Sequence, residues 1–553
     1  MVLNRQALKL HFKTAALLFV LFMMFAAMSG CSKTDETATP VTPAATPAPV
    51  ALVNTQNGQI SGLEPNANTN QWLGVPYAKP PVGDLRWRPP VAPDAWSGVL
   101  DCSGYKPQAA QHTYFANFGQ GGVSEDCLYL NITAPKNANN LPVMFWIHGG
   151  FFSILTANVA NYNNAEALPT KDVVVVTVNH RLGPFGYLAH PSLRAESADG
   201  LSGNYGQLDL IMALQWVRDN IEAFGGNPDN VTIFGQSGGG AKVLSLLTSS
   251  LAQGLFHKAI VQSGMSTTAD PSIQPLSLVE AENEGADFAT ALGLNGASAS
   301  AAAMRAISWE TIVTTVTFTG DTAAATNSLP QVIYSPTIDG YYLTNTAANI
   351  FTAGNQVDVP LMTGVTWGDG QILTGGFQEL IPTIADGYDT AGSSNPIYTY
   401  VFNHLPLGWR GITYDNNSSP NDDRTVLAYH AVELAYLFKS YNSFLTHWAM
   451  GLPYLTVMTT NEYQYQSPPG TYPNRAILNL SAIPTTDTSD SAMVDLMMTM
   501  WANFAATGNP NLEGQTTWQP YTSTSDQYLQ ITILTPPTLE DNLNTLVFPT
   551  NPI

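Results

Sequence analysis

One serine lies in a glycine-rich segment where it could act as a nucleophile. Residues 231–245 are VTIFGQSGGGAKVLS, and Gly235-Gln236-Ser237-Gly238-Gly239 within them fits G-x-S-x-G. An apolar β-branched run precedes Ser237 and an apolar helical pattern follows it. A strand ending and a helix beginning at one serine force a tight turn that needs small neighbours. The helix N-terminus also directs backbone N–H groups towards developing negative charge. The alternative is an ordinary glycine-rich connection between a strand and a helix.

A serine hydroxyl is a poor nucleophile without a base, and His430 is the candidate base. The chain has nine histidines, and His430 lies in LAYHAVELAYLF, where an apolar helical pattern begins. Asp369 lies in TGVTWGDGQ, between two glycines that follow an apolar strand, where a carboxylate can turn inward from a loop. The order serine, acid, histidine is that of the α/β-hydrolase triad.

Each of these two residues also has a simpler interpretation. His430 could be a solvated or capping histidine, and Gly-Asp-Gly is ordinary turn chemistry. Asp339 in SPTIDG is a weaker candidate acid, because it comes too early for the loop after the strand. Glu433 fits a helix beside His430 better than it fits the role of the acid.

Apolar β-branched runs alternate with helical patterns through the middle of the chain. We predict strands over 141–150, 172–183, 256–264 and 359–366 and a further one within 229–240, with helices over 206–226 and 491–511. This alternation favours the α/β class, with a mostly parallel sheet and helices on both of its faces. No second low-complexity linker and no internal repeat is evident, so we predict one domain over 51–553.

The first fifty residues are typical of an export signal followed by a tether. Residues 1–30 contain three basic residues and an apolar run over 15–27, and Cys31 follows Met-Ser-Gly. This pattern indicates a signal peptide, and MSGC resembles a bacterial lipobox, whose cysteine is lipidated. A transmembrane anchor is disfavoured because spanning a bilayer takes roughly 20 apolar residues. Residues 31–50, rich in Thr, Pro and Ala, are predicted to form an extended tether. We therefore expect an exported cell-envelope lipoprotein that is either anchored in the outer membrane or periplasmic, and by resemblance to enterobacterial sorting Ser32 favours the outer membrane.

Composition narrows the classes of partner. The 553 residues are 44% hydrophobic and carry a formal net charge of −21. No basic patch stands out, which argues against a nucleic-acid partner, and we assign the acidity no role. Of the three cysteines, Cys102 and Cys127 remain as a pair in an oxidising compartment if Cys31 is lipidated.

Longer blocks resemble the type-B carboxylesterase family, which includes the cholinesterases and bacterial para-nitrobenzyl esterases. WLGVPYAKPPVGDLRWRPP (72–90) is similar to the family's first signature and SEDCLYLNI (124–132) to its second. Further blocks follow in family order: VTVNHRLGPFGYLA, GNYGQLDLIMALQWVRDNIEAFGGNPDNVTIFGQSGGG, LFHKAIVQSG and WANFAATGNPN. The resemblance covers most of 51–530. It implies the α/β-hydrolase fold, a large mostly parallel central sheet flanked by helices, with inserted helical cap regions.

The resemblance implies roles for residues that match the family's motifs. Ser237 is then the nucleophile and His430 the base, and Asp369 holds the position of the family's usual glutamate. The backbone N–H groups of Gly150, Phe151 and Gly238 form the oxyanion hole. Gly238 stands where the family usually has alanine, and Gln236 where it has glutamate.

Other matching residues are expected to be structural. These are the ion pairs Arg86–Glu125 and Arg181–Asp209, the disulfide Cys102–Cys127 that closes a loop over the gorge, and His148. In cholinesterases that loop holds a tryptophan that binds quaternary ammonium. The loop of this chain has none, so choline esters are not the expected substrates.

We therefore expect a serine carboxylic-ester hydrolase that forms an acyl-enzyme and needs no cofactor and no metal. Its partner is a small-molecule ester, and it meets the membrane only through Cys31. Phe151 replaces the third glycine of the family's usual His-Gly-Gly-Gly. By resemblance, enzymes with three glycines accept esters of bulky tertiary alcohols, so we expect Phe151 to reduce the acceptance of such esters. Only 61 positions separate Asp369 from His430, which predicts a more open cleft for bulky acyl or aryl esters. The alternatives are a catalytically silent surface protein of the same fold and an amidase.

Overall fold

The computed structural model describes residues 51–111, 119–265, 274–315, 334–369, 371–404, 413–416, 424–425, 428, 430–440, 455–457, 462–465, 474–479, 489–532 and 537–548. The predicted signal peptide, the tether and Cys31 lie outside these residues. Within the described part of the chain, no helix combines the length and apolar character that crossing a bilayer requires.

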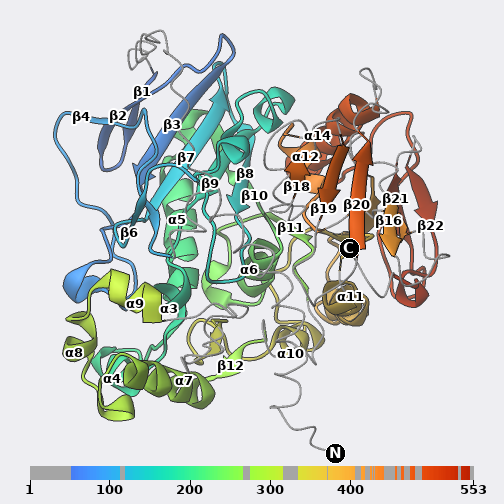
Figure 1. Cartoon of the computed structure of the whole chain (residues 1–553). Coiled ribbons are helices and arrows are strands. Elements are labelled where there is room, and N and C mark those ends of the chain that lie inside the picture. Colours follow the sequence, from blue (N-terminus) through green and yellow to red (C-terminus); the bar gives the residue numbers. More distant parts are fainter. Residues whose placement is uncertain are drawn as a thin grey trace, which may run out of the picture.

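A ten-stranded sheet forms the centre of the molecule (Figure 1). Its strands are β3 (Thr69–Pro76), β7 (Tyr129–Pro135), β8 (Leu141–Ile147), β9 (Val174–Val178), β10 (Gly226–Gln236), β11 (Lys258–Gln262), β14 (Leu361–Thr366), β15 (Ile397–Asn403), β21 (Tyr528–Thr532) and β22 (Thr538–Glu540). Across the sheet they follow the order β22-β21-β15-β14-β11-β10-β8-β9-β7-β3. Neighbours from β9 to β21 are parallel, and antiparallel pairs occur only at the two edges of this sheet. The predicted mostly parallel sheet is confirmed.

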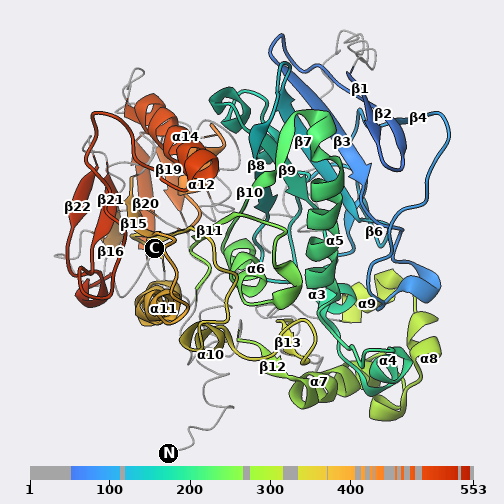
Figure 2. The same cartoon turned by 180° about the vertical axis from the view of Figure 1, so that it is seen from behind.

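Successive residues of the central strands belong to two apolar cores, one on each face of the sheet. In β8, Val143, Phe145 and Ile147 pack in one core with residues of α5 (Tyr205–Asn220) and α6 (Gly238–Leu247). Met144 and Trp146 pack in the other core, with residues of α12 (Glu433–Leu437) and α14 (Ser489–Thr507). Figure 2 shows α5 and α6 on the near side of the sheet.

The two long helices begin and end close to their predicted positions. α5 continues into a 3₁₀ turn over Ile221–Phe224, and Gly225 ends it with φ +82°. α14 is followed by Gly508, whose φ is +78°. A glycine in the left-handed region is a common helix stop because it has no Cβ to clash with the preceding turn.

Inserted segments surround the central sheet. The helices are α3 (Gly183–Tyr187), α4 (Pro191–Glu196), α7 (Leu278–Ala291), α8 (Ala301–Arg305), α9 (Trp309–Thr315), α10 (Ala347–Thr352) and α11 (Gln371–Thr390). The small sheets contain β1 (Ala51–Thr55), β2 (Gly58–Gly62) and β4 (Val99–Asp101); β5 (Gln108–Ala109) and β6 (Val123–Ser124); and β12 (Leu276–Ser277) and β13 (Thr337–Ile338).

A further small sheet was not anticipated from the sequence. It is antiparallel and contains β16 (Thr413–Asn416), β17 (Arg424–Thr425), β18 (Leu455–Val457), β19 (Glu462–Tyr465) and β20 (Asn474–Asn479). These strands come from the segments on either side of His430. The inserted regions therefore include strands as well as the predicted helices.

The predicted disulfide between Cys102 and Cys127 is wrong: both residues are buried free thiols. Backbone hydrogen bonds to Ser61 and Leu73 hold Cys102, and its Sγ faces Gly74 O at 4.0 Å. Burial raises the pKa of Cys102 to about 12 and that of Cys127 well above its ordinary value. Both thiols are therefore protonated at neutral pH, and oxidation to a disulfide needs a thiolate.

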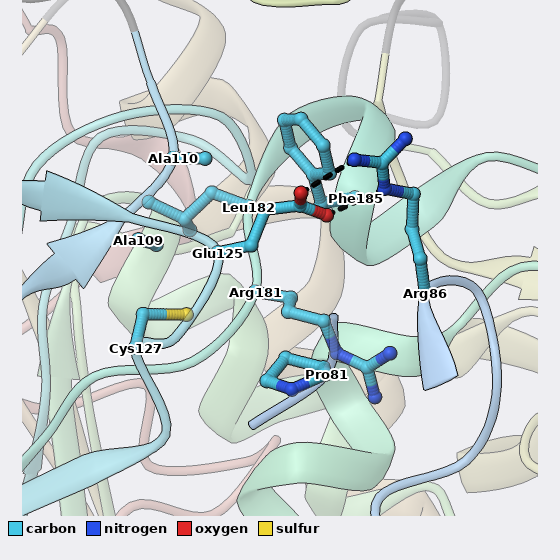
Figure 3. A pocket seen from close by; sticks show the side chains of 9 residues that line it. All are labelled: Pro81, Arg86, Ala109, Ala110, Glu125, Cys127, Arg181, Leu182 and Phe185. Atoms are coloured by element: carbon cyan, nitrogen blue, oxygen red, sulfur yellow. Dashed lines mark hydrogen bonds and ion pairs between the residues drawn. The ribbon is translucent and has the colours of Figure 1, made fainter. Parts of the chain in front are cut away.

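The two predicted ion pairs are present and buried. Arg86 Nη2 lies 2.5 Å from Glu125 Oε2, and Arg181 Nη2 lies 2.6 Å from Asp209 Oδ1. Both arginines and Cys127 line a small pocket, where Figure 3 shows Arg86 paired with Glu125. None of Ser237, Asp369 and His430 is among the described residues that line this pocket, so it is a structural feature and not the catalytic site.

We predict that Asp209→Ala lowers the free energy of unfolding by about 3–5 kcal/mol, because it leaves the buried Arg181 guanidinium without a countercharge. The two side chains are only 2% and 0% exposed. Asp219→Ala is the control, because the Arg218–Asp219 pair is 51% and 36% exposed, and its loss should cost below about 1 kcal/mol. Urea unfolding of both variants measures the difference, and equal losses would show that burial of the Arg181–Asp209 pair does not matter.

Candidate active site

Ser237 lies on a sharp turn between β10 and α6. Its φ is +58° and its ψ is −129°, a conformation that is strained for a residue with a side chain and persists only where neighbours fix it. Ser237 N–H donates to Gln262 O of β11 at 2.8 Å, and Ala241 N–H donates to Ser237 O at 3.0 Å. Ser237 is half-buried between fully buried neighbours. The turn predicted for a nucleophilic serine is present.

Glycines around Ser237 allow backbone segments to approach one another closely. A Cβ on Gly235 would lie 2.6 Å from the carbonyl carbon of Gly239, and one on Gly239 would lie 2.1 Å from Ile147 O. Both distances are below any ordinary carbon contact, so a side chain at either position would force the strand and helix apart. The small residues of the motif are therefore required by packing as well as by the turn.

His430 and Asp369 form a hydrogen-bonded pair. His430 Nδ1 lies 2.6 Å from Asp369 Oδ1, and the side chains are 28% and 0% exposed. The other carboxylate oxygen of Asp369 accepts the Thr366 N–H at 3.0 Å, at the end of β14. An ionised Asp369 keeps the proton on Nδ1, which leaves Nε2 of His430 as the acceptor that a general base needs.

Asp339, the weaker candidate acid, has a different role. One of its oxygens accepts the N–H groups of Tyr341, Tyr342 and Leu343, and the other accepts the Asn204 side chain. It therefore stabilises a turn, and Asp369 is the acid that contacts the histidine.

The pKa of His430 is raised above its ordinary value of 6.5. Burial acts against protonation, but the charge of Asp369 and its hydrogen bond outweigh burial, and Glu433 acts in the same direction only to the extent that it is ionised. A raised pKa means that the site stabilises the imidazolium that forms when His430 accepts a proton. This is the electrostatic requirement for a general base in acyl transfer.

Glu433 lies beside this pair without acting as its acid. It is 0% exposed, and Gln262 Nε2 donates to its Oε1 at 3.4 Å. Burial and then the charge of Asp369 raise the pKa of Glu433 to about 8, despite the opposing effect of His430. Glu433 is therefore mostly protonated at pH 7, and Asp369 supplies the negative charge that His430 faces.

Gln236 joins the serine turn to the histidine. Its Nε2 lies 3.1 Å from His430 Nε2, so the residue just before Ser237 touches the imidazole. Among the described residues, no hydrogen bond links Ser237 Oγ to His430, whose ring contacts are with Gln236 and Asp369. Catalytic hydrogen bonds often tighten only when substrate binds. Here the imidazole must shift from Gln236 to Ser237 before it can accept the hydroxyl proton.

The three predicted oxyanion-hole residues come together in the structure. Gly150 and Phe151 follow β8 and have left-handed φ angles of +84° and +54°, while Gly238 is the first residue of α6. A Cβ on Gly238 would lie 2.4 Å from Phe151 N and 2.2 Å from Phe151 O. The backbone of Phe151 therefore lies directly against the helix N-terminus, and an alanine at position 238 does not fit this conformation.

His148 is a structural residue, as predicted. It is fully buried and stacks on His180, with ring centroids 4.8 Å apart. Burial, followed by the charge of Lys242, lowers the pKa of His148 well below its ordinary value, so it stays neutral. Within the described residues, no cluster of three or more His, Cys, Asp or Glu side chains could hold a metal ion.

Some residues of the site were not singled out from the sequence. His180 and Lys242 both lie under the loop that follows β8, and the amide of Gln236 contacts the catalytic imidazole. The only signal for Lys242 is that one charged residue interrupts the apolar run AKVLSLL. Its partners are distant in sequence, so the pattern does not reveal what it binds.

Comparison with known proteins agrees with this geometry. A model described as "Carboxylesterase family" matches residues 49–546. The chain belongs to the carboxylesterase family. It is 39% identical over 334 residues to a fumonisin B1 esterase of Sphingopyxis macrogoltabida, covering 60% of this chain and 58% of that protein.

Two further carboxylesterase relatives support the same assignment. A para-nitrobenzyl esterase of Bacillus subtilis is 36% identical over 326 residues, which cover 58% of this chain and 63% of that protein. The chain therefore spans about three-fifths of each of these two curated relatives. A solved thermophilic PNB esterase matches with a TM-score of 0.67 and 26% identity, covering 88% of this chain and 97% of that one. The α/β-hydrolase fold with its flanked central sheet follows from this likeness.

We predict that Asp369→Asn slows the reaction of Ser237 with a fluorophosphonate by on the order of a hundredfold or more, because the tautomer of His430 is no longer fixed. The base works only when neutral, so the wild-type rate should fall as pH drops through a His430 pKa above 6.5. Without the Asp369 charge, burial has the larger effect on the pKa of His430 and lowers it. In Asp369→Asn, the decrease in labelling rate should therefore occur below pH 6.5.

Labelling rates between pH 4.5 and 9 measure both effects. Asp339→Asn is the matched control, since it removes a half-buried carboxylate that stabilises a turn and whose hydrogen bonds are to Asn204 and residues 341–343. A pH profile that moves in the Asp339 variant but not in the Asp369 variant would contradict the assignment of the acid.

Proposed function

We propose that this protein is a serine hydrolase that cleaves carboxylic esters through an acyl-enzyme intermediate. The observation that carries the proposal is the Asp369–His430 pair, held beside the strained Ser237 turn by the contact between Gln236 and the imidazole. Retention of serine, acid and histidine in one place disfavours the alternative of a catalytically silent surface protein.

The geometry supports a defined sequence of steps. Ser237 Oγ attacks the ester carbonyl carbon while His430 Nε2 takes its proton. The resulting oxyanion is bound by the backbone N–H groups of Gly150, Phe151 and Gly238, aided by the N-terminus of α6. His430 then gives its proton to the departing alcohol, and a water molecule activated by His430 releases the acid. Asp369 stabilises the imidazolium throughout.

For the substrate, we propose small to medium esters, including aryl or bulky ones. Two relatives are named for action on fumonisin B1 and on para-nitrobenzyl esters, and the second name specifies an alcohol group that carries an aromatic ring. The short spacing between Asp369 and His430 supports an open cleft. Phe151, where the family usually has a third glycine, is expected to narrow the acceptance of tertiary-alcohol esters.

The test is hydrolysis of para-nitrophenyl acetate, para-nitrophenyl butyrate and bulkier aryl esters by the wild type and Ser237→Ala. The variant should lose roughly 10⁴-fold or more in kcat, because the nucleophile is gone. Ser245→Ala is the control: its hydroxyl also lies on α6, but it faces Tyr342 Oη at 3.0 Å, and the variant should keep wild-type kcat.

Three results would contradict the proposal in different ways. A wild type that is inert on esters and unlabelled by a fluorophosphonate excludes a serine esterase. Turnover of anilides but not esters indicates an amidase. Activity limited to short, slim esters contradicts the open cleft.

We further propose that the mature protein is exported and anchored in the cell envelope, in the outer membrane, by a lipid on Cys31. The charged start, the apolar run and MSGC support this proposal. Wild type expressed in a bacterium with labelled palmitate should carry label and fractionate with outer membranes, whereas Cys31→Ser should carry none. Labelling of the Cys31→Ser variant would show that the anchor lies elsewhere.

A further inference from the structure

A buried lysine lies under the predicted oxyanion hole. Lys242 is on α6, five residues after Ser237, and is 0% exposed. Helical side chains lean towards the helix N-terminus, and the Lys242 amine accordingly reaches the loop after β8. It donates to Phe151 O at 2.7 Å and lies 3.3 Å from His148 O. It also lies 5.3 Å from the centroid of the Phe152 ring. The amine thus binds both ends of residues 148–152, which we call the oxyanion loop.

The position is electrostatically unfavourable for a cation. The N-terminus of a helix carries partial positive charge, and a buried ammonium without a carboxylate loses its hydration. Burial alone lowers the pKa of Lys242 from 10.5 to about 7. Either protonation state of the amine still has N–H donors for the two carbonyls. The hydrogen bonds from Lys242 to the carbonyls of His148 and Phe151 offset part of this cost, and they indicate that the amine holds the oxyanion loop.

The oxyanion loop needs an external restraint. Phe151 has φ +54°, which is a rare conformation for a bulky residue and costs on the order of 1–3 kcal/mol. Gly150 O accepts the N–H groups of Ser153 and Ile154, which directly follow the loop, and this fixes one side of Phe151. The Lys242 amine fixes the other side through Phe151 O. Gly238 leaves the space into which the Phe151 backbone fits.

We propose that Lys242 is a positioning residue of the ester hydrolysis proposed above: its buried amine holds the carbonyls of His148 and Phe151, so that the N–H groups of Gly150 and Phe151 stay directed at the reacting carbonyl. This inference rests on the proposed function. Lys242 does not touch the substrate; it acts through the backbone of the oxyanion loop.

The test uses Lys242→Met, which keeps the length and apolar stem and removes the N–H donors. With para-nitrophenyl butyrate, kcat per titrated active site should fall about tenfold to a hundredfold, somewhat less than loss of an oxyanion-hole donor, while KM changes less than about threefold. Lys242→Gln, which keeps an N–H donor, should retain an intermediate kcat. Lys258→Met is the matched control. Lys258 is buried on β11 at 8% exposure, its amine donates to the Asn230 side chain, and its variant should keep wild-type kcat.

A double-mutant cycle separates positioning from general stability. Phe151→Gly removes the strain at position 151, so Lys242→Met should cost at least about threefold less in kcat in that background than in the wild type. Active-site titration with a fluorophosphonate corrects for any unfolded fraction in every variant.

Four outcomes decide the matter. The proposal holds if Lys242→Met loses kcat, Lys258→Met does not, and the loss shrinks with Phe151→Gly. It is overturned if Lys242→Met keeps kcat within twofold while Ser237→Ala is inactive, a result that leaves the esterase function intact. It is overturned equally if the Lys242→Met loss is the same in both backgrounds. Activity retained by Ser237→Ala would instead overturn the proposed function, and with it this inference.

Discussion

The site depends on one close backbone contact, between the first turn of α6 and the loop that follows β8. Cβ atoms on Gly238 and Gly239 would collide with Phe151 and with Ile147 O respectively. β8, β10, β11 and β14 are adjacent parallel strands, so their carboxyl ends meet at one edge, where ligands bind in open α/β sheets. β8 supplies the oxyanion loop, β10 the serine, β11 the carbonyl that fixes the serine, and β14 the acid. If α6 moved away, the strained turn and the oxyanion hole would be lost together.

Burial determines which groups of the site are charged. Desolvation keeps His148 and His180 neutral and holds Glu433 protonated near neutrality. Asp369 is left as the carboxylate that contacts His430, and its charge outweighs the desolvation of the imidazole. Negative charge is thus concentrated on the side of His430 remote from its Nε2. The helix N-terminus and the Lys242 amine provide positive potential near the oxyanion hole, so the site is already polarised in the direction that acyl transfer requires.

The sequence predicts the parts of this arrangement that depend on local pattern and chain order. Alternating strands and helices indicate the parallel sheet, and the glycines about Ser237 indicate the turn, since both follow from near-neighbour sterics. Pairing of Asp369 with His430 could be predicted from chain order together with the family resemblance, because order alone left a turn aspartate and a capping histidine as alternatives. The Lys242 contacts could not, since they join a helix to a loop some ninety residues earlier. The state of Cys102 and Cys127 also depends on tertiary placement, and there the prediction was wrong.

Two departures from the family's usual residues, at positions 151 and 238, make physical sense together with the buried Lys242. Phe151 in place of glycine imposes strain at φ +54°, and an alanine at position 238 would collide with the Phe151 backbone in that conformation. Gly238 removes the collision, and the Lys242 amine holds the strained carbonyl. Each of the three features alone would be costly: a strained phenylalanine without support, a glycine that weakens a helix start, or a buried amine without acceptors. Together, the three features allow the oxyanion loop to carry a phenyl side chain while its backbone N–H groups stay close to Ser237. We therefore expect substitutions at positions 151, 238 and 242 to be strongly non-additive.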